Sequence, residues 1–453
     1  MMKIIIVGLG NVGETLAVTL LEEGNSITVV DLSAEKIKKI TDKYDILGIV
    51  GNGATHTTLR EAGISSADLL IAVTESDELN LLCCTIAKKT SRAHTIARVE
   101  SPEYSTEVEY LKEGLGLSMV INPEEEAAQE ICRLIRFPEA TNIETFAKGK
   151  VELFKFRVPE GSLLIGMTVK DIVLKLKLNL LICTVERGED EAYIPKADFA
   201  FAERDVVSVI ASPRTAEAFF KKIGGKGGSV RDMIMVGASD ITHYIMKEMH
   251  RGGVNIKVID PDLTSCEELA SKYDELTVIH GDPTEQELLI EEGLRQTDAF
   301  VALSDTDEEN ILMSMFARRA SEGKIITKIN RPEYKTITTG LDLDTIIYPK
   351  NIAADRITRF VRSLLATEGN NVENVYSIIK GKVEVTEFVI GKLFSELGTP
   401  LSQLSLKPDV IIAAILRGRS LIIPHGQDVL MAGDSVVVVS KHLGIGDFRD
   451  LFD

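Results

Sequence analysis

The chain repeats itself, and this repetition restricts its possible folds more than any other feature. Gly8 has a counterpart in Gly237, and Asp31 has one in Asp260, each half a chain length further on. More pairs keep the same order: Gly51-Asn52 with Gly281-Asp282, Asp68 with Asp298, Asn80 with Asn310, Pro195 with Pro424, and Asp205 with Asp434. Because only small insertions or deletions separate these matches, the sequence indicates a tandem duplication. The fold is therefore expected to contain two similar halves.

Each half begins with alternating strand and helix patterns. In the first half, a helix is predicted at residues 12–23, directly after the first apolar run, and another at 123–136, beginning at Pro123. The short apolar runs that predict strands are residues 3–7, 26–31, 46–50, 69–73, 95–99 and 118–121. Alternation of this kind is typical of an α/β fold with a Rossmann-like, doubly wound parallel sheet.

After residue 140 the pattern changes to that of a small α+β lobe. Strands are expected at 151–158 and 206–210, with short helical or loop pieces between them, and again at 383–390 and 435–439. The glycine-rich segment 224–229 has the composition of a flexible linker. The predicted domains are a first Rossmann-like domain at 1–138, a first small lobe at 139–223, the linker at 224–229, a second Rossmann-like domain at 230–367, and a second small lobe at 368–453.

Composition excludes several classes of partner. The net charge of −18 and the absence of tryptophan disfavour binding to nucleic acid, which usually needs a basic face or stacking aromatics. Five cysteines without a C-x-x-C pair predict no disulfide framework, and a reducing cytoplasm is expected. We expect no leader peptide, and no apolar run approaches membrane-spanning length. Any role at a membrane is therefore expected to pass through a partner.

The strongest chemical signal is the loop after the first strand, which reads Gly8-Leu9-Gly10-Asn11-Val12-Gly13. This G-x-G-x-x-G motif stands between a strand and a helix, and Asp31 ends the next strand at the expected spacing. Gly8 would allow the tight turn, Gly10 the approach of a pyrophosphate, and Gly13 the close packing of the helix. Asp31 would accept hydrogen bonds from adenosine ribose hydroxyls, and since Leu-Ser-Ala follows it, NAD is favoured over NADP. The alternative is that the glycines only serve a sharp turn.

Other candidate residues follow neighbouring strands. Asn52 and Gly53 could border the adenine or form a plain turn. Thr74 and Asp77 have the spacing of a helix-capping box, which would also lie beside the ligand. Arg98 ends the fifth strand, where its cation could pair with a phosphate or with a nearby acid. All five residues are predicted to contribute to the nucleotide site.

The second repeat departs from this pattern. Its loop reads Gly237-Ala238-Ser239-Asp240-Ile241-Thr242, so serine and threonine replace the second and third glycines. Ser239 would crowd a pyrophosphate, and Thr242 would loosen the packing of helix on strand. Lys328 stands in place of Arg98, whereas Asp260 is retained and could still hold adenosine. We expect a weakened or lost second site.

Taken together, several features resemble the RCK (KTN) domain family: the motif at residues 8–13, Asp31, residues 51–53, residues 74–80, Arg98 and the duplicated plan of a Rossmann lobe followed by a small lobe. TrkA-type peripheral subunits of Trk potassium-uptake systems belong to it, and the resemblance covers essentially the whole chain. It implies that NAD(H), or ATP and ADP, binds the Rossmann lobe, and that the small lobe (RCK_C) takes part in sensing and assembly. It further implies a homo-oligomer, a dimer or tetramer of two-module chains, on the cytoplasmic face of an integral membrane potassium channel or transporter subunit.

Three classes of function remain open at this point. The favoured one is a regulatory nucleotide-sensing subunit without enzymatic activity. An NAD-dependent dehydrogenase would need a proton donor beside the nicotinamide, and no histidine lies in a recognisable catalytic motif. A scaffold with a vestigial site conflicts with the intact glycines of the first repeat. Acidic clusters at 124–126 and 305–309 are interpreted as helix starts rather than metal sites, and Cys83-Cys84 as buried packing.

Overall fold

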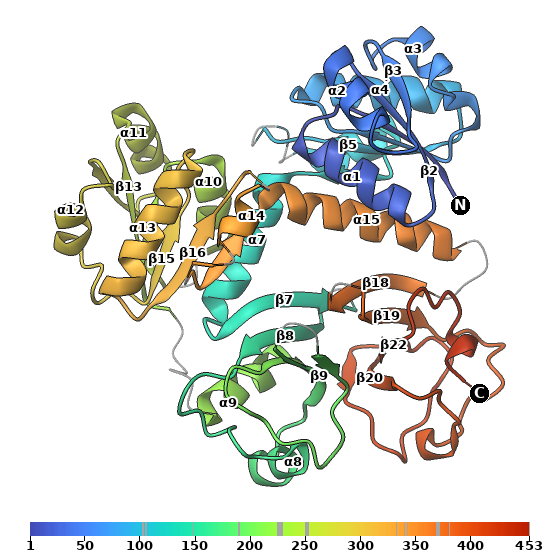
Figure 1. Ribbon diagram of the computed structural model, residues 1–453, viewed down its shortest axis with the longest axis vertical. Coiled ribbons are helices and arrows are strands. Elements are labelled where there is room, and N and C mark those ends of the chain that lie inside the picture. Colours follow the sequence, from blue (N-terminus) through green and yellow to red (C-terminus); the bar gives the residue numbers. More distant parts are fainter. Residues whose placement is uncertain are drawn as a thin grey trace. The chain divides into compact units, whose positions relative to one another are not determined.

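The computed structural model forms two compact units, each assembled from both repeats (Figure 1). One unit contains residues 1–132 and 231–358, and the other contains residues 133–230 and 359–453. The structure describes residues 1–101, 104, 107–147, 149–188, 191–223, 230–249, 253–331, 333–338, 340–341, 343–367, 372–379 and 381–452. The predicted linker, residues 224–229, lies outside the described residues.

The first unit holds two six-stranded parallel sheets with the same strand order. In repeat one the order is β3-β2-β1-β4-β5-β6, and in repeat two it is β14-β13-β12-β15-β16-β17. The first sheet comprises β1 (Lys3–Val7), β2 (Ser26–Asp31), β3 (Leu47–Val50), β4 (Leu69–Ala72), β5 (His94–Arg98) and β6 (Met119–Ile121). The second comprises β12 (Asp232–Val236), β13 (Asn255–Asp260), β14 (Thr277–His280), β15 (Ala299–Ala302), β16 (Lys324–Lys328) and β17 (Thr345–Ile347). Both confirm the predicted doubly wound α/β fold.

Helices connect these strands and cover both faces of each sheet. Those of repeat one are α1 (Asn11–Glu22), α2 (Ala34–Thr41), α3 (His56–Glu61), α4 (Asp77–Thr90) and α6 (Val108–Leu115), with a short 3-10 helix at Ile64–Ser66. Those of repeat two are α10 (Asp240–Met249), α11 (Leu263–Lys272), α12 (Gln286–Glu291), α13 (Asp307–Ala320) and α14 (Tyr334–Thr338). The central strands β1, β4, β12 and β15 are buried almost throughout because they have covered faces on both sides.

Two long helices leave the sheets after the sixth strand of each repeat. They are α7 (Pro123–Arg136), at the predicted residues, and α15 (Pro349–Thr367). Each begins at a proline, which suits the first turn of a helix because it has no N–H to leave unpaired. Within the first unit the two helices meet through an ion pair of 2.8 Å between Arg356 Nη1 and Glu126 Oε2.

The second unit holds two five-stranded antiparallel sheets, which confirms a small α+β lobe in each repeat. The first comprises β7 (Ala140–Phe146), β8 (Val151–Arg157), β9 (Leu181–Arg187), β10 (Glu191–Tyr193) and β11 (Val206–Ala211), with helices α8 (Val169–Leu176) and α9 (Pro213–Lys222). The second comprises β18 (Val372–Ile379), β19 (Val383–Val389), β20 (Val410–Arg417), β21 (Ser420–Ile422) and β22 (Ser435–Ser440), with 3-10 helices at Leu401–Gln403 and Phe448–Leu451.

The expectation of only helix and loop between the strands at 151–158 and 206–210 is wrong. The segment contains β9 and β10, and β9 lies directly beside β11. Its apolar run, Leu181–Val185, is short enough to be read as part of a helix, and pairing with β11 decides its conformation. The two small lobes then share one core, in which Phe146 and Val151 of the first pack with Val383 and Val385 of the second.

Candidate functional site

The glycines of the first loop have three different structural roles. Gly8 has φ +99°, and a Cβ there would lie 2.9 Å from the backbone nitrogen of Thr74. A Cβ at Gly13 would lie only 1.9 Å from the carbonyl oxygen of Gly8, so the helix could not pack as it does. A Cβ at Gly10 would have no neighbour within 4 Å, which means that this glycine faces open space. Gly8 and Gly13 are required by the fold, whereas Gly10 leaves room for a ligand.

The backbone N–H groups at the N-terminus of α1 lie beside the same open space and have no side-chain cap. No side chain of the described chain accepts a hydrogen bond from its first turn. By contrast, Ser33 caps α2 and Ser76 caps α4 with their hydroxyl groups. Free N–H groups and the positive end of the helix dipole together make α1 suited to hold an anion such as a pyrophosphate.

Asp31 holds the loop in place from the end of β2. Its Oδ2 accepts the N–H of Leu9 at 2.6 Å, and its Oδ1 accepts the N–H of Ser33 at 2.8 Å. A carboxylate has further lone pairs, so ribose hydroxyls could still be accepted beside these two bonds. The structure therefore gives Asp31 a role in shaping the loop, in addition to the predicted role in ribose binding.

The turn after β3 is tight for reasons of packing. Asn52 Oδ1 accepts the N–H of Ala54 at 2.9 Å, which closes a local turn. A Cβ at Gly53 would lie 2.3 Å from Cγ1 of Val7 in the first strand. Both residues line the cavity described below, so the turn and the predicted contact with adenine are compatible.

The predicted capping box of Thr74 and Asp77 is wrong. Ser76 caps α4, and Asp77 accepts hydrogen bonds from the N–H groups of Glu100 and Ser101, at 3.0 and 2.9 Å. The hydroxyl of Thr74 donates instead to Asn80 Oδ1 at 2.7 Å. Spacing alone suggested the box, but the N-cap of α4 is Ser76, two residues after Thr74, and the carboxylate of Asp77 holds the chain after β5.

Arg98 is paired with an acid of its own loop. Its Nε donates to Glu100 Oε1 at 2.8 Å, a second guanidinium nitrogen contacts the same oxygen, and Nη1 donates to the carbonyl of Thr74 at 3.3 Å. Of the two alternatives considered for this residue, the structure shows the acid pair. A phosphate would compete with Glu100 for the same guanidinium, so the predicted contact with ligand remains a prediction.

These elements surround a cavity of about 510 Å³, a size usual for small-molecule sites. Its lining includes Gly8, Gly10, Asn11, Val12, Asp31, Asn52, Gly53, Thr74 and Arg98 from the predicted set. Leu9, Gly13 and Asp77 are not among the lining residues; Leu9 and Gly13 shape the backbone of the loop, and the carboxylate of Asp77 holds the chain after β5. Sequence reasoning did not select Leu32, Lys36, Glu75, Ser76, Leu79 and Lys350, which also line it. Leu32, Glu75, Ser76 and Leu79 lie within two residues of a selected residue, whereas Lys36 lies on α2 and Lys350 belongs to the second repeat.

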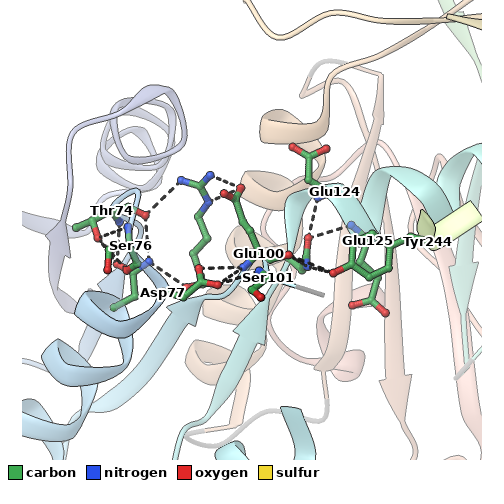
Figure 2. Close-up of polar contacts among 11 residues, drawn as sticks. Thr74, Ser76, Asp77, Glu100, Ser101, Glu124, Glu125 and Tyr244 are labelled. Atoms are coloured by element: carbon green, nitrogen blue, oxygen red, sulfur yellow. Dashed lines mark hydrogen bonds and ion pairs between the residues drawn. The ribbon is translucent and has the colours of Figure 1, made fainter. Parts of the chain in front are cut away.

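The cavity wall connects to the second repeat through polar contacts (Figure 2). The carbonyl of Glu100 accepts hydrogen bonds from Asn122 Nδ2 at 3.1 Å and from the hydroxyl of Tyr244 at 3.2 Å. Asn122 Nδ2 also donates to the Tyr244 hydroxyl at 2.9 Å, and its Oδ1 caps α7 by accepting the N–H groups of Glu124 and Glu125. Since Tyr244 lies on α10, the residue that binds Arg98 is in direct contact with the other Rossmann lobe.

The loop after β12 in repeat two keeps the turn seen after β1 but has Ser239 and Thr242 where repeat one has Gly10 and Gly13. Gly237 has φ +104°, as Gly8 has a positive φ, and Asp260 again accepts two loop N–H groups at 2.7 Å each. The hydroxyl of Ser239 is buried and has no hydrogen-bond partner in the described part of the chain. The looser packing expected at Thr242 stays a prediction, and the structure shows that this fully buried side chain donates a hydrogen bond of 2.6 Å to the carbonyl of Gly237.

Other candidate features are structural. All five cysteines are free and buried, and burial raises the pKa of Cys83 to about 12, which makes its thiol unreactive. Among the residues that the structure describes, no cluster of three or more His, Cys, Asp or Glu side chains could hold a metal ion. In the same residues, no helix is both long and apolar enough to cross a membrane.

Comparisons with known proteins cover nearly the whole chain. Residues 4–123 and 233–349 match the TrkA-N domain, and residues 153–224 and 388–453 match the TrkA-C domain. The chain is 30% identical over 451 residues to a Trk system potassium uptake protein TrkA homolog of Archaeoglobus fulgidus, with 100% of both chains covered. It is 31% identical over 459 residues to TrkA of Halomonas elongata, covering 100% of this chain and 98% of that protein. The solved GsuK channel bound to NAD has a similar fold, with a TM-score of 0.63 at 16% identity over 97% of this chain and 76% of that chain.

Proposed function

The chain belongs to the TrkA family of Trk potassium-uptake proteins, and we propose that it is the nucleotide-sensing regulatory subunit of such a system. In this proposal it binds NAD(H), or ATP and ADP, and the bound nucleotide controls ion flow through a membrane subunit. It acts through binding and not through catalysis. The family resemblance expected from the sequence is thus confirmed, and the finer statements below go beyond it.

The observation that carries the proposal is the open anion site at α1. An uncapped helix N-terminus, the free space at Gly10 and the carboxylate of Asp31 lie around one cavity. The first two suit a pyrophosphate, and the third suits the ribose of an adenosine. An adenine nucleotide satisfies all three at once, and the GsuK channel bound to NAD shows that a protein of this fold binds one of them.

The polar contacts at Glu100 supply a route from ligand to conformation. A phosphate that binds Arg98 competes with Glu100, whose own carbonyl accepts from Asn122 and Tyr244. Movement of this loop therefore changes a contact between the two Rossmann lobes. A ligand shifts such an equilibrium only by its differential affinity for the two arrangements, and Arg98 is where that difference would arise.

The proposed assembly follows from the duplication. Each repeat is a module with a Rossmann-like domain, at 1–138 or 230–367, and a small lobe, at 139–223 or 368–453. Two or four chains would associate as a homo-oligomer on the inner face of the cell membrane, held there by the potassium channel or transporter subunit. The family name of the relatives, potassium uptake protein, supports such a partner.

The experiment that tests this function has two steps. The full chain is first titrated calorimetrically with NADH, NAD, ATP and ADP. It is then co-purified with the membrane subunit, which is identified and reconstituted in vesicles for potassium flux measurements with and without each nucleotide that binds. We expect binding and a nucleotide-dependent change in flux. A chain that binds none of the four nucleotides, or a flux that no bound nucleotide alters, would refute the proposal.

A further inference from the structure

Helix α8 of the first small lobe presents an apolar face to solvent. Val173 and Leu174 are 54% and 60% exposed, whereas Ile172 is buried in the core of the lobe. In Figure 1, α8 lies at the outer edge of this lobe. Single exposed leucines are common on protein surfaces, but large apolar side chains that lie together on an outer helix face mark a contact surface. The packing of the lobe therefore does not account for these two residues.

Lysines flank this apolar pair at both ends of the helix. Lys170 lies on the same face as Val173 and Leu174, because residues three and four positions apart are neighbours on a helix. Lys177 caps the C-terminal end. Both lysines are exposed, and within the described part of the chain neither ammonium group has a hydrogen bond or an ion pair. The face is therefore apolar in its middle and positively charged at its ends.

The acidic residue within α8 is engaged with its own helix. Asp171 Oδ2 accepts the N–H and the hydroxyl of Thr168, at 3.0 and 2.8 Å, and Lys175 Nζ lies 3.4 Å from its Oδ1. A further cation, Lys222 of α9, donates a hydrogen bond of 2.7 Å to the carbonyl of Leu176. Although the whole chain carries a charge of −18, charges more than about 8 Å away are largely screened at physiological salt, so these nearby lysines dominate at α8.

The loop before α8 adds two more apolar side chains, since Leu163 and Ile165 are both exposed. The loop and the start of the helix are held beside one segment, residues 199–201. The N–H of Gly166 donates to the last carbonyl of this segment at 2.9 Å, and the N–H of Val169 donates to the first at 3.1 Å. Adjacent parts of the lobe thus expose four large apolar side chains.

The second small lobe lacks this surface. Matching β-bridges identify its equivalent segment, since Thr168 pairs with Ala200 in the first lobe and Pro400 pairs with Val429 in the second. There the chain forms only the 3-10 helix Leu401–Gln403. The exposed side chains in this part of the second lobe are polar: Ser402, Gln403 and Ser405. The architecture that the two lobes share therefore does not require an exposed apolar helix at this place.

The shape and charge of this face favour a membrane surface over a protein partner. A second copy of the chain, related by a two-fold axis, would bring lysine against lysine in either direction of the helices, which is repulsive. Peptide partners bind in grooves or along sheet edges, whereas a projecting helix is convex. A convex face with apolar side chains between lysines suits the boundary of a bilayer, where the apolar groups enter and the ammonium groups stay at the headgroups.

We propose that α8 and the loop before it form a direct contact between the first small lobe and the anionic surface of a lipid bilayer. Val173 and Leu174 enter the boundary between headgroups and acyl chains, and Lys170 and Lys177 lie at the lipid phosphates. This contact goes beyond the proposed function, in which the membrane subunit alone holds the chain at the membrane. It also distinguishes the two small lobes, because only the first contacts lipid.

Flotation of the full chain with lipid vesicles tests this contact in the absence of any protein partner. The vesicles are phosphatidylcholine alone, or phosphatidylcholine with about one third phosphatidylglycerol as the anionic lipid. The wild type should bind the anionic vesicles and not the neutral ones, and added salt should weaken the binding. The double change Lys170→Gln and Lys177→Gln should lower the partition coefficient about twentyfold, since each lysine near an anionic surface contributes about fivefold. Arginine at both positions should preserve the binding.

The apolar part of the contact is tested by Leu174→Ser. This change should lower the partition coefficient for anionic vesicles about tenfold, the factor expected when one large apolar side chain no longer leaves water. The matched controls lie in the second small lobe, where Leu393 is almost fully exposed and follows the exposed Lys392. Leu393→Ser and Lys392→Gln should leave vesicle binding unchanged. Circular dichroism and thermal unfolding check that every variant keeps its fold.

Several outcomes would overturn the proposal. A wild-type chain that does not bind the anionic vesicles is one, and binding that the α8 variants leave unchanged, or that the controls lower equally, is another. If the α8 variants bind vesicles normally and lose only their co-purification with the membrane subunit, the face binds a protein and not lipid. The proposed function does not depend on these results, because nucleotide binding and nucleotide-dependent flux are measured separately.

Discussion

The two Rossmann lobes have one topology, and the comparison between them separates residues that hold the fold from residues that face a ligand. Gly8 and Gly237 both adopt a positive φ at the end of the first strand. Asp31 and Asp260 both fix the loop by accepting two backbone N–H groups. Conservation of these features within the chain therefore follows from the architecture and requires no ligand.

The positions that differ are those that face the cavity or the helix behind it. Gly10 becomes Ser239, Gly13 becomes Thr242, and Arg98 becomes Lys328. By contrast, Asp77 is retained as Asp307, which has the same structural role and accepts the N–H groups of Asn330 and Arg331. The sequence leaves open that the retained Asp260 still holds adenosine, and its hydrogen bonds to the N–H groups of Ala238 and Asp262 give it a structural role as well.

The largest effect is expected from closing the space at Gly10. Gly10 has an extended backbone conformation that valine accepts, with φ −77° and ψ −174°, and its Cβ would touch nothing in the protein. Gly10→Val should therefore abolish nucleotide binding while the protein stays folded. Ser239→Val, the matched change in repeat two, should leave binding unaltered. Calorimetric titration of both variants measures the difference, and equal losses would show that the second site binds nucleotide as well.

The second largest effect is expected where Gly13 packs against the carbonyl of Gly8. Gly13→Thr copies repeat two into repeat one, where the new Cβ would approach the Gly8 carbonyl to 1.9 Å. We expect a destabilisation of about 3 kcal/mol, at the upper end of the usual range for overpacking. Thr242→Gly should cost about 1–2 kcal/mol, through the lost hydrogen bond and the added backbone freedom.

Urea unfolding of both variants, followed by intrinsic tyrosine fluorescence and circular dichroism, measures these changes in the free energy of unfolding. If Gly13→Thr is as stable as the wild type, the two loops can interchange their packing, and the difference in sequence has no structural cause.

A smaller effect is expected for Asp31 and Asp260, which should differ in their contribution to nucleotide affinity. Asp31→Ala and Asp260→Ala each remove an acceptor of two loop N–H groups, so their costs in stability should be similar. Only Asp31→Ala should also weaken nucleotide binding, by about 1.5–3 kcal/mol, the usual contribution of a hydrogen bond to a charged group. Parallel titrations and thermal unfolding measure both quantities. An Asp31→Ala variant with unchanged affinity would leave this residue with its structural role alone.

The smallest effect concerns the pH dependence of Glu124. Its pKa is raised above the ordinary value of 4.5 by burial, so the folded chain binds this proton more tightly than the unfolded chain does. Its contribution to stability is therefore favourable at low pH and is lost as the pH rises from 4.5 through the raised pKa. In the Glu124→Gln variant, the free energy of unfolding should therefore depend less on pH across that window. Thermal unfolding at a series of pH values measures this. The same slope in both proteins would contradict this assignment.

Much of the fold follows from the sequence because it depends on local patterns. Apolar runs and helical periodicity predicted all of the first six strands to within one residue at each end, and α7 at its observed bounds. The glycines at 8 and 13 could be assigned because a tight turn and a close helix have few chemical solutions. The strand β9 was missed because an isolated apolar run does not say whether it will pair with a neighbour.

What the sequence determined by itself is the duplicated α/β plan, the order of elements and the loop chemistry that distinguishes repeat one from repeat two. Only the tertiary structure decided which distant groups meet. In the folded chain, the carboxylate of Asp77 accepts a hydrogen bond from the segment after β5, and Arg98 pairs with Glu100. Lys350 of the second repeat lines the cavity of the first. The physical reason is that local patterns specify the turn and helix at each position, whereas the partner of a charge depends on how helices such as α15 pack against another lobe.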